Sequence, residues 1–230
     1  MKSNYRNRSV SEYLFHFTGL NVERKNFKTD EDSFNILLDI LKERKLKYSR
    51  NTKSIVFQKE PKSSLENVEV AMICLTETPI QFLEIHMLAF NQFGIGLNRD
   101  WGVKNGAMNV IYYSNEHPNV LGTLFIGLLE RYFNKEENQL DTEYYIDHTI
   151  AGITEDISKN PDLRDEREVR FIKDYKDKAL DAGVGFESND LKYIVVKKRY
   201  QDRLNDFLES DPYWKNNKNF DILNSEDITE

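Results

Sequence analysis

Residues 11–18 read SEYLFHFT, and this aromatic-rich stretch begins the predicted fold. Short runs rich in Phe, Tyr and Thr favour a β-strand. Because successive side chains of a strand point to opposite faces, the residues sort into two sets. One predicted face carries Tyr13, Phe15 and Phe17, and the other carries Leu14, His16 and Thr18.

After residue 29 the spacing of the apolar residues changes. They recur at i, i+3, i+4 and i+7, at Phe34, Leu37, Leu38 and Leu41. This spacing predicts an amphipathic helix. We expect Asp30 to cap its N-terminus, and the basic residues near 42–45 suit the negative end of its dipole.

The remaining elements follow from the same patterns. Strands are predicted at 53–58, 68–75, 93–97, 108–114, 166–172 and 191–198. Helices are predicted from Thr78 to about residue 91 and at 120–133, 143–155 and 200–208, with a loop at 98–106. Gly94 and Gly96 indicate either a bulge or a close backbone approach. The order contains no regular βαβ repeat, which predicts one α+β domain over 1–208 and a polar, fraying tail over 209–230.

Composition limits the class of protein. The 230 residues carry a net charge of -7, and 39% of them are hydrophobic. This balance predicts a soluble globular protein and disfavours non-specific binding to nucleic acid. A single cysteine, Cys74, excludes a disulfide framework and a cysteine-rich zinc site, so no metal is expected. Because no apolar run approaches the roughly 18 residues of a membrane span and no signal-peptide pattern begins the chain, we expect a cytoplasmic protein without membrane contact.

The pair His16 and Thr18 is the first candidate site. Two residues apart on a strand, their side chains point the same way and are placed to hold one ligand. The alternative is a histidine at the edge of the core that bonds a backbone carbonyl.

Arg99 is the second candidate. It lies in FGIGLNRDWG, residues 93–102, beside a glycine-containing strand. Its guanidinium suits a phosphate, because it donates two parallel hydrogen bonds. The alternative is an arginine paired with Asp100 or another acid.

The segment EREVR, residues 166–170, is the third candidate. On a strand Glu166, Glu168 and Arg170 would share one face. A carboxylate lining a cleft suits the stabilisation of a cationic transition state, such as an oxocarbenium ion. The alternative is a charged, solvated edge strand. We interpret His86, His148 and Cys74 as structural residues.

Several of these segments occur in a familiar order. HFT at 16–18, the leucine-rich helix, CLTETPI at 74–80, FGIGLNRDWG and EREVRF at 166–171 together resemble the AbiGi family of bacterial abortive-infection proteins. A related pattern is similar to the ADP-ribosyltransferase fold, with mixed, mainly antiparallel sheets flanked by helices. The resemblance implies anti-phage defence and a toxin or antitoxin partner.

The same resemblance implies roles for individual residues. His16 and Thr18 would hold NAD, and Arg99 would contact a phosphate or position NAD. Glu168 would stabilise the oxocarbenium ion, and Glu166 would prepare the acceptor. Two functions follow from it. One is NAD-dependent ADP-ribosylation of nucleic acid or protein, and the other is a non-catalytic antitoxin or interaction module that neutralises a partner toxin. A nucleotide sensor is a weaker third.

Overall fold

The computed structural model describes residues 11–21, 26–59, 62–113, 149–150, 152–156, 167–173 and 182–228, with residues 124 and 127. The predicted helix at 120–133 falls almost entirely outside this part of the chain. So do most of the predicted helix at 143–155, His148 and Glu166.

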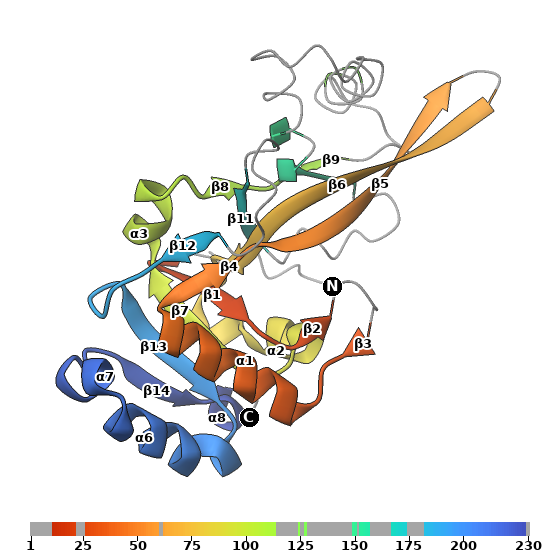
Figure 1. Ribbon diagram of the computed structural model, residues 1–230. Coiled ribbons are helices and arrows are strands. Elements are labelled where there is room, and N and C mark those ends of the chain that lie inside the picture. Colours follow the sequence, from red (N-terminus) through yellow and green to blue (C-terminus); the bar gives the residue numbers. More distant parts are fainter. Residues whose placement is uncertain are drawn as a thin grey trace, which may run out of the picture.

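The largest described sheet has eight strands in the order β14-β13-β7-β1-β6-β11-β8, with β5 pairing to β6. These strands are β1 (Tyr13–Phe17), β5 (Ser49–Lys59), β6 (Lys62–Thr76), β7 (Gly94–Asn98), β8 (Met108–Asn109), β11 (Glu168–Ile172), β13 (Leu191–Val196) and β14 (Asp221–Asn224). Its pairs are antiparallel except β13 with β14, so the chain is an α+β protein with a mainly antiparallel sheet. Figure 1 shows the long β5–β6 ribbon extending beyond the other strands of this sheet.

Smaller elements complete the described part of the chain. Three two-stranded sheets pair β2 (Leu20–Asn21) with β3 (Asn26–Phe27), β4 (Lys45–Lys47) with β12 (Gly183–Gly185), and β9 (Ile111–Tyr113) with β10 (Thr154–Asp156). The helices are α1 (Asp30–Glu43), α2 (Glu84–Phe90), α3 (Arg99–Lys104), α6 (Gln201–Ser210), α7 (Pro212–Asn216) and α8 (Ser225–Ile228). Short 3-10 turns lie at Ile80–Phe82 and Lys198–Tyr200. No helix within the described ranges is long and apolar enough to cross a membrane.

Helices cover both faces of the sheet, as Figure 1 shows for α1 and α2. On one face, α1 and α6 bury a large core against alternate residues of β1, β7 and β13. On the other face, Leu83 and Met87 beside α2 pack on Phe15 and Val195. The predicted alternation of β1 is confirmed, because Leu14 belongs to the first core and Phe15 to the second.

The helix predicted after residue 29 is confirmed as α1, but its predicted cap is wrong. The hydroxyl of Thr29 accepts a hydrogen bond from the backbone N–H of Asp32, and the Asp32 carboxylate accepts one from the backbone N–H of Thr29. This reciprocal capping box places Thr29 at the N-cap. Asp30 is therefore the first helical residue, and its carboxylate turns toward the C-terminal part of the chain.

The glycine pattern of β7 is confirmed as a close approach. A Cβ atom built on Gly94 would lie 2.4 Å from the backbone oxygen of His16, and one on Gly96 would lie 2.7 Å from the ring of Phe15. Both distances are too short for a side chain. Glycine at these positions therefore lets β7 lie flat against β1 and the large aromatic ring of Phe15.

Three sequence predictions are wrong. The expected loop at 98–106 contains α3, and the expected strand at 108–114 is divided between β8 and β9, which belong to different sheets. The expected fraying tail is ordered: β14 pairs with β13 from Asp221 to Asn224, and Trp214 is fully buried. Most residues of this segment are polar, so its composition does not reveal the few apolar side chains that hold it to the core.

Candidate functional site

His16 and Thr18 lie on the face of the sheet that α1 covers. Nδ1 of His16 is 2.9 Å from the backbone carbonyl oxygen of Cys74. The buried hydroxyl of Thr18 lies 2.8 Å from the carbonyl oxygen of Ser33 in α1 and 3.3 Å from that of Phe93. These contacts confirm the alternative in which His16 bonds a backbone carbonyl. Both side chains join β1 to its neighbours.

Burial sets the charge of His16. It lowers the pKa of the imidazole below its ordinary value, the hydrogen bond to Cys74 opposes that change, and the charge of Lys28 adds to it. His16 is therefore neutral at pH 7 and donates from Nδ1 to the carbonyl.

The opposite face carries a polar cluster at the end of β6. Nε2 of His86, on α2, lies 3.1 Å from the hydroxyl of Thr76 and 2.9 Å from that of Thr78. The Thr76 hydroxyl donates to that of Thr78 at 2.8 Å. All three side chains are buried. The cluster fixes α2 against the strand through side chains whose polar atoms are satisfied.

Glu168 belongs to this second face, because β11 pairs Glu168 with Thr76. Both of its carboxylate oxygens accept from Arg170, at 2.8 Å from Nε and 2.5 Å from Nη2. Only 13% of the Glu168 side chain and 5% of the Arg170 side chain are exposed. Arg170 also donates to the carbonyl of Gly152 at 2.8 Å. The alternative of a solvated edge strand is wrong for these two residues, since the pair is nearly buried.

Arg99 lies at the start of α3 and pairs with an acid, as its alternative predicted. Its Nε is 3.5 Å from Oε2 of Glu77, the residue between Thr76 and Thr78. The other oxygen of Glu77 accepts from the side-chain amide of Asn109 at 3.3 Å. Glu77 is buried, whereas Arg99 is about two-fifths exposed. Glu77 therefore links the side chain of Arg99 to the end of β6.

The register separates the predicted NAD-binding residues into two groups. Phe15, Thr76 and Glu168 are paired across three neighbouring strands, so their side chains share one face. His16 pairs with Ile95 and points to the other face, the face of Thr18. Glu166 lies outside the described residues. Within the described ranges, no group of three His, Cys, Asp or Glu residues is arranged to hold a metal ion.

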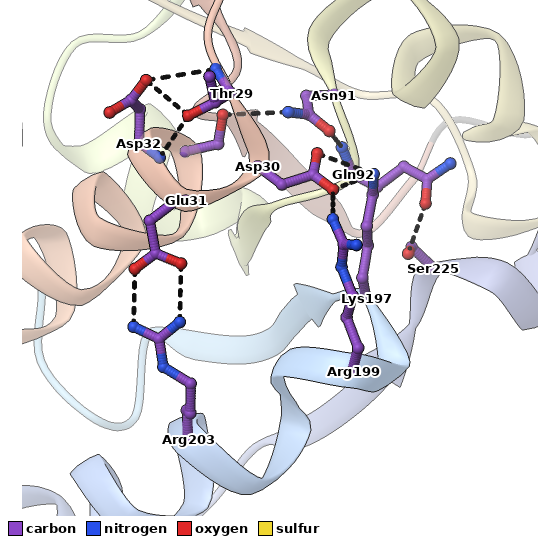
Figure 2. A network of polar contacts seen from close by, with 11 residues as sticks. Thr29, Asp30, Glu31, Asp32, Asn91, Gln92, Lys197, Arg199, Arg203 and Ser225 are labelled. Carbon is purple, nitrogen blue, oxygen red and sulfur yellow. Dashed lines mark hydrogen bonds and ion pairs between the residues drawn. The ribbon is translucent and has the colours of Figure 1, made fainter.

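A second network joins the N-terminus of α1 to the segment after β13 (Figure 2). Nζ of Lys197 lies 2.7 and 2.8 Å from the two oxygens of Asp30, and Arg199 donates to the same carboxylate. Arg203 forms two hydrogen bonds of 2.8 Å with Glu31. The basic side chains of Lys197, Arg199 and Arg203 are therefore paired with acids of the same chain.

Asp30 should contribute more stability than Glu31. Only about a fifth of its side chain is exposed, against about half for Glu31. Burial raises the pKa of Asp30, but the hydrogen bonds and charges of Lys197 and Arg199 outweigh it, so the pKa is lowered. A lowered carboxyl pKa stabilises the fold above the unfolded value, and this contribution disappears as the pH falls through the folded value.

We therefore expect Asp30→Asn to lower the free energy of unfolding at pH 7 by about 1–2 kcal/mol. Glu31→Gln should have a smaller effect, because exposed ion pairs contribute little. Urea unfolding at pH 7 measures both variants. Equal losses in the two would show that burial does not distinguish these pairs.

His86 should make the stability depend on pH. Burial lowers its pKa to about 4, against a smaller opposing effect of the Glu168 charge. The unfolded histidine binds a proton near pH 6.5, so between pH 6.5 and about 4 the unfolded state holds more protons. Stability is therefore lost as the pH falls through this window, by at most about 1.4 kcal/mol per pH unit.

Urea unfolding over this pH window measures the effect. His86→Gln keeps a polar group near Thr76 and Thr78 but does not titrate, so its unfolding free energy should vary less with pH. The lowered pKa of His16 acts in both proteins and cancels in their difference. If the unfolding free energies of the unmodified chain and His86→Gln depended on pH in the same way, His86 would not be the group that titrates in this window.

The chain was compared with known proteins. Residues 35–213 match the family model described as "Putative abortive phage resistance protein AbiGi, antitoxin". This match covers well over half of the 230 residues. The chain belongs to the AbiGi family. The family's description gives it a role in phage resistance by abortive infection, as an antitoxin. No curated protein and no solved structure matches the chain. The match includes Arg99 and Glu168 and begins after His16 and Thr18.

Sequence reasoning missed most of the polar centre at the end of β6. The interpretation of His86 as structural agrees with its contacts, but the sequence assigns Thr76, Glu77 and Thr78 to no site. The available signal was the segment TET at 76–78, where two hydroxyls flank a carboxylate at strand spacing. Its partners come from α2, β11 and α3, and only the register brings them together.

Proposed function

We propose that this chain is a non-catalytic antitoxin that binds and neutralises a protein toxin. The observation that carries the proposal is the buried pair of Glu168 and Arg170. Both carboxylate oxygens of Glu168 accept from the guanidinium, and only 13% of the side chain is exposed, so the group is committed to holding Arg170 and little of it is open to a ribose hydroxyl. A partner-binding protein needs no reactive carboxylate, whereas the predicted enzyme depends on this one.

The charge of the chain supports the same function. Its net charge is -7, while Lys197, Arg199 and Arg203 are paired with acids of α1. An acidic protein of this kind attracts a basic partner and speeds their encounter.

NAD-dependent ADP-ribosylation is the second candidate. It is supported by the carboxylate of Glu168 beside Thr76 and His86, a group of polar side chains on one face. The described residues do not gather around one NAD molecule, because His16 and Thr18 lie on the other face. We therefore derive no catalytic step from them.

The two candidates differ in what Glu168 does. We would co-express the chain with the protein encoded by the adjacent gene and measure co-purification and rescue of growth. A non-catalytic antitoxin should form a stoichiometric complex, and Glu168→Gln, which keeps an oxygen acceptor for Arg170, should still rescue growth. Thermal unfolding of the variant checks that it is folded at the assay temperature.

Turnover is measured on the unmodified protein. Purified chain incubated with NAD and cell extract should release no nicotinamide and transfer no label to nuclease-sensitive or protease-sensitive material. Nicotinamide release that disappears in folded Glu168→Gln would overturn the antitoxin proposal in favour of the enzyme. Failure of the adjacent protein to bind would also count against it.

A further inference from the structure

A cavity of about 280 Å³ lies between the end of α1, α3 and the segment that follows β12. Its lining residues are Glu43, Arg44, Trp101, Asn105, Gly185, Phe186, Glu187 and Asp190. It is separate from the polar cluster of Thr76, Thr78 and His86 at the end of β6, which shares none of these residues. Figure 1 shows α3 and β12 side by side at this end of the sheet.

The walls of the cavity are held in place by hydrogen bonds. The indole Nε1 of Trp101 donates to the carbonyl of Gly185 at 2.9 Å, and the backbone N–H of Phe186 donates to the carbonyl of Arg44 at 2.9 Å. The hydroxyl of Tyr213 donates to Glu187 at 2.6 Å. A site fixed in this way loses little conformational entropy when a ligand binds.

The charges of the lining favour a cation. The lining contains three carboxylates and one guanidinium. The carboxylates belong to Glu43, Glu187 and Asp190, and the guanidinium belongs to Arg44. Glu43 is paired with Lys47 at 2.6 Å. Glu187 accepts from Tyr213, and Asp190 accepts from the backbone N–H of Glu187 at 2.9 Å. In the described part of the chain neither of these two carboxylates has a basic side chain within ion-pair distance.

The guanidinium of Arg44 is held by the ring of Tyr213. It lies 4.0 Å from the centre of that ring, in the geometry of a cation–π contact. If a basic residue of another protein entered the cavity, the peptide carbonyls beside that residue could accept hydrogen bonds from the N–H groups of Arg44. The cavity thus combines two carboxylates for a cation with a guanidinium that can donate to a peptide backbone.

We propose that this cavity receives an arginine or lysine side chain of the partner toxin. The inference rests on the proposed antitoxin function and names the contact that function would use. Glu187 and Asp190 would bind the cationic group, and the small exposed edges of Trp101 and Phe186 would contact its stem. A cavity of this size holds one side chain and is small for a dinucleotide.

The first experiment uses a model peptide. Titration of the isolated chain with the tripeptide Ac-Gly-Arg-Gly-NH2 should shift the indole N–H resonance of Trp101. The matched peptide Ac-Gly-Glu-Gly-NH2 should leave it unchanged. No shift with the arginine peptide, or an equal shift with the glutamate peptide, would overturn the proposal.

The second experiment uses variants of the chain with the protein encoded by the adjacent gene. Glu187→Gln with Asp190→Asn removes both charges but keeps oxygen acceptors for Tyr213 and the backbone. This double variant should weaken the complex at least about thirtyfold, the effect of breaking a desolvated charge pair. The control Asp206→Asn with Glu209→Gln removes the same charge from exposed positions of α6 and should change affinity little.

The outcomes separate this inference from the proposed function. A complex whose affinity is unchanged in the Glu187 and Asp190 variant would leave the antitoxin function standing and overturn the cavity assignment. An equal loss in the α6 control would also overturn it, because net charge alone would then explain binding. No complex with the unmodified chain would contradict the antitoxin function itself, and the peptide titration would still test the cavity.

Discussion

Arg170→Met is expected to lower the free energy of unfolding by about 3–5 kcal/mol, the cost of leaving one partner of a buried ion pair alone. Glu168 would keep a nearly buried carboxylate that has lost both hydrogen bonds to the guanidinium. The carbonyl of Gly152 would lose the donor Nη1 as well. Because a domain is stable by only about 5–15 kcal/mol, this single change removes a large share of the total.

A double-mutant cycle isolates the pair. Glu168→Gln combined with Arg170→Met removes both charges and should cost less than Arg170→Met alone, since no unpaired charge remains. Urea unfolding monitored by tryptophan fluorescence gives each free energy. A double variant that is no more stable than Arg170→Met would show that Glu168 is not the residue that needs the guanidinium.

The sequence predicted the elements whose pattern is local. β1 and α1 follow from hydrophobic period alone, and their observed faces agree with the predicted ones. The glycines of β7 indicated a close approach, and His16 and Phe15 are the groups they approach. In each case neighbouring residues in the sequence contain the whole signal.

Elements that depend on distant contacts were predicted less well. The helix α3 has six residues, and it is stabilised by Trp101, which packs against Phe171 and bonds Gly185. The N-cap was predicted one residue late because Thr29 and Asp30 are both good capping residues. The capping box with Asp32 selects Thr29, and the ion pairs with Lys197 and Arg199 give the Asp30 carboxylate partners far away in the sequence.

The candidate site shows the same limit. Residue types correctly indicated polar roles for His16, Arg99 and Glu168, but the partners of His16 and Arg99 lie far away in the sequence, and only that of Glu168 lies in the same segment. Glu168 bonds Arg170, Arg99 pairs with Glu77, and His16 bonds the carbonyl of Cys74. Register decides which face each side chain occupies, and a shift of one residue would reverse every assignment.

The C-terminal segment is the strongest case of a local pattern that misleads, and Trp214 explains it. The residues from 209 onward are mostly polar, yet the indole of Trp214 is fully buried and packs edge-on against Phe220. Its Nε1 donates to the carbonyl of Leu41 at 2.8 Å. Leu41 lies in the last turn of α1, where carbonyls have no partner within the helix. One side chain thus fills the core and satisfies a helix end.

We therefore expect Trp214→Ala to cost about 3–5 kcal/mol, from the cavity and the lost transfer free energy. Trp214→Phe keeps most of the ring but leaves the Leu41 carbonyl without its donor, and it should cost about 1–3 kcal/mol. Lys215→Ala, on the exposed side of the same helix, should change stability by no more than about 0.5 kcal/mol. Thermal and urea unfolding measure all three variants.

If Trp214→Ala were as stable as Lys215→Ala, the C-terminal segment would be a tail and not part of the core. A loss in the expected order would show that α7 is held to α1 and the core through this indole, because the variants remove first its hydrogen bond and then its packing.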